Sequence, residues 1–305
     1  MTRPLDILIL SDGKPGHVNQ SFGLAEAIGR IRDVTISKVS LDGTRGPARR
    51  IARAWREAST VPRPDLLIGA GHAVHPSLLV LARRYDAPSV VLMKPTLPGA
   101  LFDLCLIPEH DLGAGPPPEH VIPTLGALNR VPPPDNRFRH GGLILLGGPS
   151  GSHGWDAAAI EGAVTAIVSA CGDRPWRITD SRRTPEGTLA ALAAKCPALA
   201  CYPHLDTGRD WLPQRLAEAA EVWVSEDSVS MIYEALSSGA RVGLLPVPSL
   251  KKAGRVARGI TGLVERGFAT RFADWSPDRG LTAPPHVLRE ADRCAALVLD
   301  TLRLP

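Results

Sequence analysis

The chain has few of the features that mark disulfide-rich, zinc-binding or nucleic-acid-binding proteins. Its five cysteines contain no C-x-x-C pair, so we expect neither a disulfide framework nor a zinc site. We expect reduced thiols at all five positions, Cys105, Cys171, Cys196, Cys201 and Cys294. Aromatic residues make up only 5% of the chain. A groove that stacks single-stranded nucleic acid needs aromatic residues interleaved with basic ones, and this chain has no such segment. We therefore expect no nucleic-acid partner.

Long apolar runs and an export signal are also missing. The longest apolar run, residues 66–82, contains two histidines and three Gly or Pro residues and falls short of a membrane span. The chain is inside an apolar segment by residue 6, which leaves no room for a secretory leader. We expect a cytoplasmic protein, with peripheral association to the inner face of the membrane as an alternative.

The small net charge of +4 lies wholly in the first half of the chain. Residues 1–140 hold 17 Lys/Arg and 13 Asp/Glu, whereas the remainder is balanced, 18 against 18. Most of the excess comes from residues 44–58, where arginines recur at helical spacing and Ile51 and Trp55 share another face. This pattern predicts a basic amphipathic helix. It is either a solvated face or a surface for anionic headgroups, carried by Arg45, Arg49, Arg53 and Arg56.

Apolar, strand-like segments alternate with helical patterns along the whole chain. Six such segments precede residue 128, at 5–10, 34–39, 65–70, 89–94, 103–108 and 120–125. The polar, proline-rich stretch 128–140 interrupts the pattern, which then restarts at 141. We expect an α/β protein of two doubly wound, Rossmann-like domains facing across a cleft, with parallel sheets. The expected bounds are 1–135, 136–285 and a C-terminal helix, 286–305, leaning back to the first domain.

The loop after the first segment, "SDGKPGHVNQ" at 11–20, holds the most reactive side chains of the first domain. Gly13, Pro15 and Gly16 predict a tight turn into a helix, with His17 at its mouth as a group able to take a proton near neutral pH. Alternatively, His17 and Asn19 only cap the helix and satisfy loop backbone.

A second glycine loop, "GAGHAVHPSLLVLARR" at 69–84, places His72 and His75 three residues apart. Two histidines at this spacing can bind a metal, but no third ligand lies nearby in the sequence. We favour a loop that shapes an acceptor pocket.

Two loops of the second domain have the composition of phosphate-binding turns. Residues 143–156 place Gly147, Gly148 and Gly151 around Ser150, without matching a P-loop or a dehydrogenase fingerprint. Residues 221–248 run from a strand through a serine-rich turn into a short helix that Gly239 ends. Such serines can hold a diphosphate, and a glutamate further along the helix can bind ribose hydroxyls. The alternative is N-capping by Asp227 or Ser228, with Glu234 as an exposed helix residue.

Together these loops resemble those of two-domain glycosyltransferases of the GT-B fold, in particular the peptidoglycan N-acetylglucosaminyltransferase that makes lipid II. Over nearly the whole chain, "SDGKPGHVNQSFGLAEAIG", "EDSVSMIYEALSSGARV" and "KKAGRVARGITGLVERGFATRF" resemble the family named after the plant "elongated mitochondria" fission protein. Its bacterial members are identified as glycosyltransferases, whereas its plant members are known as membrane-recruited fission factors.

The resemblance implies roles for individual residues. Glu234 would bind the donor ribose, Ser228, Ser230, Gly148 and Gly151 would line the diphosphate, and His17 would lie near the transferring sugar. With the loop chemistry added, we expect three groups of site residues. They are catalytic His17, Asp12 and Lys94; donor-binding Gly148, Ser150, Gly151, Asp227, Ser228, Ser230, Met231 and Glu234; and acceptor-side Gly16, Asn19, Gln20 and His72.

The expected reaction is transfer of a sugar from a nucleotide-diphosphate donor to a lipid-linked or envelope glycan acceptor. No D-x-D pair occurs in the chain, so we expect no metal and no other cofactor, with the helix N-terminus and serines neutralising the leaving diphosphate. One alternative is a nucleotide-sugar 2-epimerase of the same fold. Such an enzyme needs several carboxylates around the sugar, whereas the loop at 11–20 supplies only Asp12, which counts against this alternative. The other is a non-catalytic, membrane-recruited scaffold.

Overall fold

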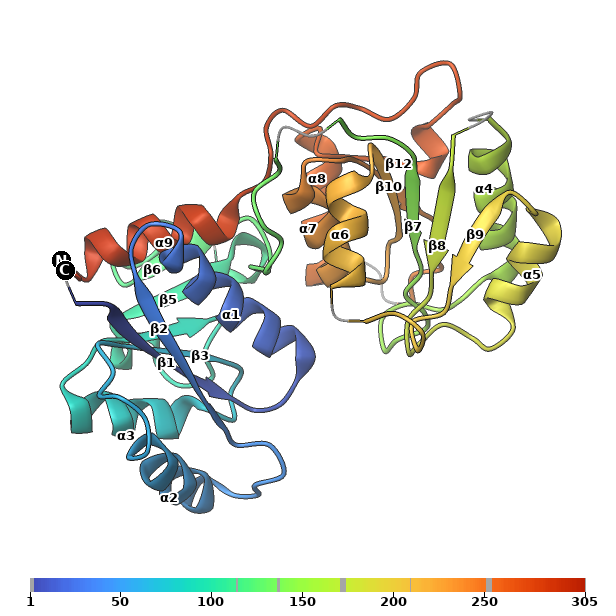
Figure 1. The fold of residues 1–305 in the computed structure, drawn as a ribbon. Helices are drawn as coiled ribbons and strands as arrows, with labels where there is room; N and C mark the ends of the chain where they lie inside the picture. Colours follow the sequence, from blue (N-terminus) through green and yellow to red (C-terminus); the bar gives the residue numbers. More distant parts are fainter. Residues whose placement is uncertain are drawn as a thin grey trace. The chain divides into compact units, whose positions relative to one another are not determined.

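The computed structural model describes residues 3–113, 115–135, 138–170, 174–208, 210–250 and 254–304. The chain divides into two compact units (Figure 1): Met1–Arg130 with Arg289–Pro305, and Val131–Leu288. The division after Arg130 lies five residues before the predicted one, inside the proline-rich stretch. Cys171, one of the predicted reduced thiols, lies outside the described residues.

The first unit is a parallel six-stranded sheet in the order β2-β1-β3-β4-β5-β6. The strands coincide closely with the predicted apolar segments and are β1 (Leu5–Ser11), β2 (Val34–Ser40), β3 (Leu66–Ala70), β4 (Ser89–Leu92), β5 (Leu104–Pro108) and β6 (Val121–Thr124). The connecting helices are α1 (Pro15–Gly29), α2 (Pro47–Ala58), α3 (His75–Tyr85) and the short 3₁₀ turns η1 (Gly99–Leu101) and η2 (Glu109–Asp111).

Alternation along the strands builds a core on each face of this sheet. Ile7 and Ile9 of β1 pack with α1 and with α9 (Glu290–Thr301), whereas Leu8 and Leu10 pack on the opposite face with α2 and α3. Figure 1 shows α9, in red, beside α1, in blue, although the two helices are far apart in the sequence. The last helix of the chain therefore completes the core of its first unit.

The second unit repeats the architecture, with a parallel sheet in the order β12-β11-β10-β7-β8-β9. Its strands are β7 (Gly142–Leu145), β8 (Trp176–Thr179), β9 (Leu199–Tyr202), β10 (Glu221–Ser225), β11 (Arg241–Leu245) and β12 (Ala269–Arg271), the last of which the sequence pattern did not indicate. Its helices are α4 (Ala157–Ala170), α5 (Thr188–Lys195), α6 (Trp211–Glu218), α7 (Val229–Ser238), α8 (Arg255–Glu265) and the 3₁₀ turn η3 (Phe272–Asp274). The expected pair of doubly wound α/β units is confirmed.

Glycines on neighbouring strands make room for two buried tryptophans in this second core. Trp176 pairs with Gly142 of β7, and Trp223 pairs with Gly243 of β11. A Cβ atom would lie 2.2 Å from the Trp176 ring at Gly142 and 2.3 Å from the Trp223 ring at Gly243. Both glycines are therefore required by packing rather than by a turn.

In each unit the loops with reactive residues follow the carboxyl ends of the strands, the edge where doubly wound sheets bind ligands. Within the described part of the chain, no helix combines the length and apolarity needed to cross a membrane.

Candidate functional site

The reactive centre of the first unit is a histidine–aspartate pair that follows β1. The Nδ1 atom of His17 lies 3.0 Å and 2.9 Å from the two carboxylate oxygens of Asp12. The Asp12 side chain is 6% exposed and the His17 side chain 19% exposed. Because Nδ1 is directed at the carboxylate, the opposite nitrogen, Nε2, is left to accept a proton from another group. The imidazole is thus hydrogen-bonded to Asp12, and the N-cap of α1, Lys14, has no side-chain cap bond.

Gly71 leaves room for this pair, whereas the two glycines of the loop after β1 differ from each other. Gly71, which follows the adjacent strand β3 with φ +86°, would bring a Cβ to 2.4 Å from the His17 ring. Gly13, with φ +83°, would bring a Cβ to 2.5 Å from Asp42. By contrast, Gly16 is exposed and its Cβ would meet nothing within 4 Å, so a close approach to another residue requires glycine at Gly13 and not at Gly16. The glycine loop after β3 therefore serves to hold the histidine.

Other predicted residues of the first unit are spread along the same edge. Lys94 is exposed and its Nζ donates to the backbone carbonyl of Asp111 at 3.2 Å. It follows Met93, whose φ of 69° is unusual for a side-chain-bearing residue. Gln20 is buried and donates to the Met93 sulfur at 3.5 Å, and Asn19 is half-buried. This places Gln20 as a support for the strained turn that carries Lys94.

The two histidines after β3 have different surroundings. His72 is exposed, whereas His75 is 2% exposed, lies 3.5 Å from the Thr96 hydroxyl and meets Phe102 edge-on. Burial lowers the pKa of His75 to about 4, with the charge of His72 as a second cause. Among the described residues no cluster of three His, Cys, Asp or Glu side chains could hold a metal.

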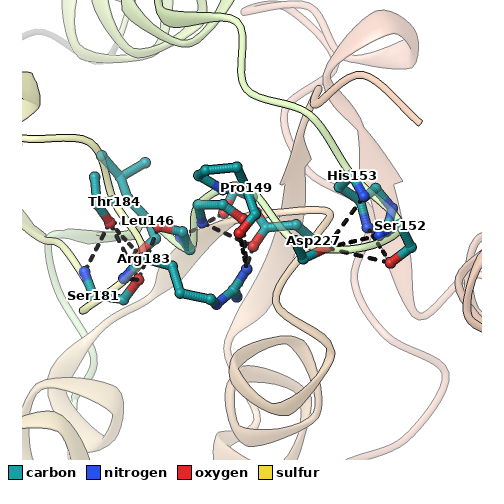
Figure 2. A network of polar contacts seen from close by, with 12 residues as sticks. Leu146, Pro149, Ser152, His153, Ser181, Arg183, Thr184 and Asp227 are labelled. Carbon is teal, nitrogen blue, oxygen red and sulfur yellow. Dashed lines mark hydrogen bonds and ion pairs between the residues drawn. The ribbon is translucent and has the colours of Figure 1, made fainter. Parts of the chain in front are cut away.

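In the second unit, a buried carboxylate ties the glycine loop after β7 to the start of α7 (Figure 2). The Asp227 side chain is 0% exposed; its Oδ2 accepts from the Gly148 amide at 2.9 Å and pairs with the Arg183 guanidinium at 2.8 Å. Arg183 also donates to the carbonyls of Gly148 and Pro149, and the Gly147 amide donates to Ser225 Oγ at 2.7 Å. The loop is therefore fastened to its neighbours by its own backbone.

This arrangement changes the interpretation of two predicted donor-binding residues, Gly148 and Asp227, and of the neighbouring Gly147. The amides of Gly147 and Gly148, which we expected to be free for phosphate, already have acceptors in Ser225 and Asp227. A Cβ at Gly147 would lie 2.1 Å from Asp227, and one at Gly148 would lie 2.0 Å from the Arg183 carbonyl. These glycines admit Asp227 and the Arg183 backbone, so Asp227 holds the loop and caps no helix.

The rest of the glycine loop is a local turn. Ser150 Oγ accepts from the amides of Ser152 and His153 at 3.3 Å and 3.2 Å, and Gly151 is exposed with open space around it. Ser228 stands at the N-cap of α7 without a side-chain cap bond, which also excludes the capping alternative for that residue.

Helix α7 presents one face toward a pocket at the carboxyl edge of the sheet. The pocket has a volume of about 480 Å³. It is lined by Ser228, Ser230 and Met231, by Thr179–Arg183 from the last residue of β8 onward, by His204 and Thr207 after β9, and by Trp211 and Leu212 at the start of α6. Glu234 is half-buried and lies three and four residues beyond Met231 and Ser230, on the same face of α7. Gly239, with φ 82°, ends the helix as predicted.

Sequence reasoning missed the residues that line the far side of this pocket. Nδ1 and the backbone amide of His204 both bond Asp180 Oδ1, at 2.9 Å and 2.6 Å. Arg182 is an exposed cation on the same wall. The signal available in the sequence was their position, since both segments directly follow apolar, strand-like runs.

A second carboxylate lies beside Asp227. Glu226 Oε1 is 3.3 Å from Arg271 Nε, and burial raises the pKa of this glutamate despite the opposing effects of Arg271 and His153. It lies at the carboxyl end of β10, outside the pocket lining described above.

The predicted basic helix differs from expectation in two ways. Gly46, with φ 83°, precedes α2, so Arg45 lies outside the helix. Arg53 is turned inward, bonding Glu57 Oε1 at 2.7 Å, the Asp42 carbonyl at 2.9 Å and the Thr44 hydroxyl at 2.9 Å. Arg49 and Arg56 are exposed, and Trp55 is 47% exposed between them.

Solved structures of similar fold cover almost the entire chain. MurG of Acinetobacter baumannii is 13% identical, with a TM-score of 0.50 over 98% of this chain and 92% of that one. The UDP-GlcNAc 2-epimerase of Neisseria meningitidis, bound to UDP-GlcNAc, is 10% identical, with a TM-score of 0.57 over 99% and 100%. The glycosyltransferase SnogD of Streptomyces nogalater is 16% identical, with a TM-score of 0.55 over 99% and 96%. The fold is therefore GT-B.

No curated protein matches the sequence at a significant level. The model of one protein family, described as "Mitochondrial fission ELM1", matches residues 15–302. This match spans both units, the histidine that pairs with Asp12, the Asp227 network and α9. The chain belongs to the Mitochondrial fission ELM1 family.

Proposed function

We propose that this protein is a glycosyltransferase that moves a sugar from a nucleotide-diphosphate donor to a lipid-linked or envelope glycan acceptor. The observation that carries the proposal is the Asp12–His17 pair, because an imidazole whose Nδ1 is held by a buried carboxylate can use Nε2 as a general base. Structures of the same fold include glycosyltransferases and enzymes bound to UDP or UDP-GlcNAc, which supports a nucleotide sugar as the ligand.

The donor would bind at the carboxyl edge of the second sheet. The pocket of about 480 Å³ there falls within the size range of small-molecule sites, roughly 300–1,000 Å³. Hydroxyls of Ser228 and Ser230 and the guanidinium of Arg182 offer hydrogen-bond donors to a diphosphate. Glu234, which lies beyond the pocket lining on the same face of α7, would offer acceptors to ribose hydroxyls. Asp227 and Gly148 would act indirectly, by holding the loop that borders Arg183.

The first unit would bind the acceptor and supply the base. His17 Nε2 would take the proton of the acceptor hydroxyl while that oxygen attacks the anomeric carbon of the sugar. The bond from this carbon to the diphosphate oxygen breaks, and the nucleoside diphosphate leaves with the electron pair. Lys94 would stabilise developing negative charge, and Gly16, Asn19, Gln20 and His72 would border the acceptor.

We propose that this transfer needs no divalent metal. The chain lacks a D-x-D pair, and the start of α7 with its serines and neighbouring guanidinium groups would neutralise the leaving diphosphate. Turnover should therefore survive EDTA. Complete loss in EDTA, restored by Mn²⁺ or Mg²⁺, would contradict this proposal.

The deciding experiment combines ligand binding with a product assay. A nucleotide sugar that binds the folded protein should raise its melting temperature, and adding a lipid-linked acceptor should release nucleoside diphosphate. An epimerised nucleotide sugar formed without acceptor would instead identify a 2-epimerase. A protein that binds no nucleotide sugar would be a scaffold.

We also propose peripheral attachment to an anionic membrane surface through the exposed side of α2. Arg49 and Arg56 with Trp55 combine cationic groups and an amphipathic ring, which suits a headgroup region, and Arg45 adds a charge just before the helix. A lipid-linked acceptor would be reached from such a position.

A further inference from the structure

The pocket of the second unit has two chemically different ends. The sheet order places β7 and β8 between β10 and β9, so the start of α7 and the loop after β9 are three strand spacings apart, about 14 Å. On the β10 side stand the Ser228 and Ser230 hydroxyls and the guanidinium that bridges to Asp227. On the β8–β9 side stand Asp180 and His204.

The second end presents hydrogen-bond acceptors. Asp180 Oδ1 receives both the amide and Nδ1 of His204, at 2.6 Å and 2.9 Å, so the neutral imidazole keeps its proton on Nδ1. Nε2 then carries a lone pair on the edge of the ring opposite Asp180, and His204 is one of the residues that line the pocket. The Thr207 hydroxyl bonds the His204 carbonyl at 3.0 Å and stiffens the loop.

We propose that His204, oriented by Asp180, selects the base of the donor nucleotide by accepting a hydrogen bond from a ring N–H. This inference rests on the proposed function, since it assigns the base to the β8–β9 end and the diphosphate to the α7 end. Uracil and guanine carry such an N–H on the pairing edge. Cytosine and adenine present a bare ring nitrogen at that place, whose lone pair would face that of Nε2.

The test compares nucleotides that differ only at this edge. We would measure binding of UDP, CDP, GDP and ADP to the full-length protein by calorimetry. Uracil gains a hydrogen bond to Nε2, whereas the ring nitrogen of cytosine places its lone pair against that of Nε2. UDP should therefore bind at least about tenfold tighter than CDP. For the same reason GDP should bind tighter than ADP by a similar factor.

Variants locate the preference. In His204→Phe, which keeps a ring and loses the acceptor, the UDP-to-CDP ratio should fall to near one while UDP still binds. The matched control is Tyr202→Phe, at the end of β9 and outside the pocket lining, where the ring contact with Trp211 remains and the ratio should not change.

The outcomes separate this inference from the proposed function. CDP or ADP binding as tightly as UDP or GDP, or a preference that survives in His204→Phe, would overturn the inference while leaving a nucleotide-binding protein. If none of the four nucleotides binds, the proposed function fails and the base assignment fails with it. Should His204→Phe not fold, the wild-type ratios still decide.

Discussion

At the residue scale, the proposed chemistry depends on His17 and its partner Asp12. Replacing His17 by Ala should lower turnover by about 10² to 10⁴, the usual contribution of a general base, and leave nucleotide affinity unchanged because the pocket belongs to the other unit. Asp12→Asn should also lower turnover strongly, because the amide removes the charge that stabilises the imidazolium and can donate to Nδ1, which places the ring proton on Nε2. Glu234→Ala should instead act on binding of the donor. It should weaken nucleotide affinity at least about tenfold, because the charge-assisted hydrogen bonds to the ribose hydroxyls are lost. Normal turnover by folded His17→Ala would reduce the pair to a loop support.

His75 should make the first unit sensitive to mild acid. In the folded protein its pKa is lowered to about 4 by burial, whereas an unfolded histidine titrates near about 6.5. Between these values the unfolded chain binds a proton that the folded chain does not, so stability should fall as the pH drops from about 6.5 to about 4, by up to roughly 3 kcal/mol.

Urea unfolding at pH 7 and pH 4.5 would measure this loss. His75→Gln cannot titrate and should lose less stability over the same interval than the wild type. His72→Gln removes only the smaller cause of the lowered pKa of His75, so its loss of stability should be close to that of the wild type and slightly smaller. Equal losses in wild type and His75→Gln would contradict the assignment.

At the element scale, the pairing of β10 with β11 requires a glycine opposite a tryptophan. Gly243→Ala would place a Cβ 2.3 Å from the Trp223 ring, which is 0% exposed, so it should destabilise the protein by about 1–3 kcal/mol through overpacking. The matched control is Gly162→Ala on α4, where a Cβ meets nothing within 4 Å and helix propensity predicts a gain of about 0.5–1 kcal/mol. Denaturant midpoints of the two variants should shift in opposite directions.

The exposed side of α2 should bind an anionic membrane surface. Anionic vesicles should sediment the protein at low salt and release it at high salt, because the attraction is screened over about 8 Å at physiological ionic strength. Arg49→Gln with Arg56→Gln should weaken this binding. Removing two charges elsewhere, with Lys195→Gln and Arg241→Gln, should not. Equal binding to neutral vesicles, or none to either kind, would reject a lipid surface as the partner.

At the scale of the whole molecule, the last segment of the chain stabilises the unit that is synthesised first. Cys294, Ala295 and Val298 of α9 are 0% exposed in the core of the first unit, and Glu290 accepts from the Leu125 amide at 2.8 Å. Truncation after Leu288 should therefore produce an early thermal transition from the first unit. Nucleotide should still raise the melting temperature of the second unit. One unchanged transition would show that α9 is dispensable.

The alternation of apolar and helical segments was sufficient to predict two doubly wound α/β units, because burial on both faces of a parallel strand leaves a local apolar run. The position of His17 in the first turn of the helix that follows β1 was likewise a local signal, as was Gly239 at the end of α7. The family resemblance identified the loops of interest and the GT-B fold.

Only the tertiary structure decided which partners these residues meet. Asp227 and Gly148 are 79 residues apart, so no local pattern could indicate that Asp227 accepts from the Gly148 amide that was expected to bind phosphate. Asp180 and His204 are 24 residues apart, so no local pattern could indicate that they pair and line the pocket. Arg49 and Arg53 likewise have the same local pattern, yet one is exposed and the other is fastened to Glu57, Asp42 and Thr44. The periodicity of apolar residues indicates which side chains are buried. Hydrogen bonds between loops depend instead on the order of the strands in the sheet, which the order of the segments along the chain does not determine.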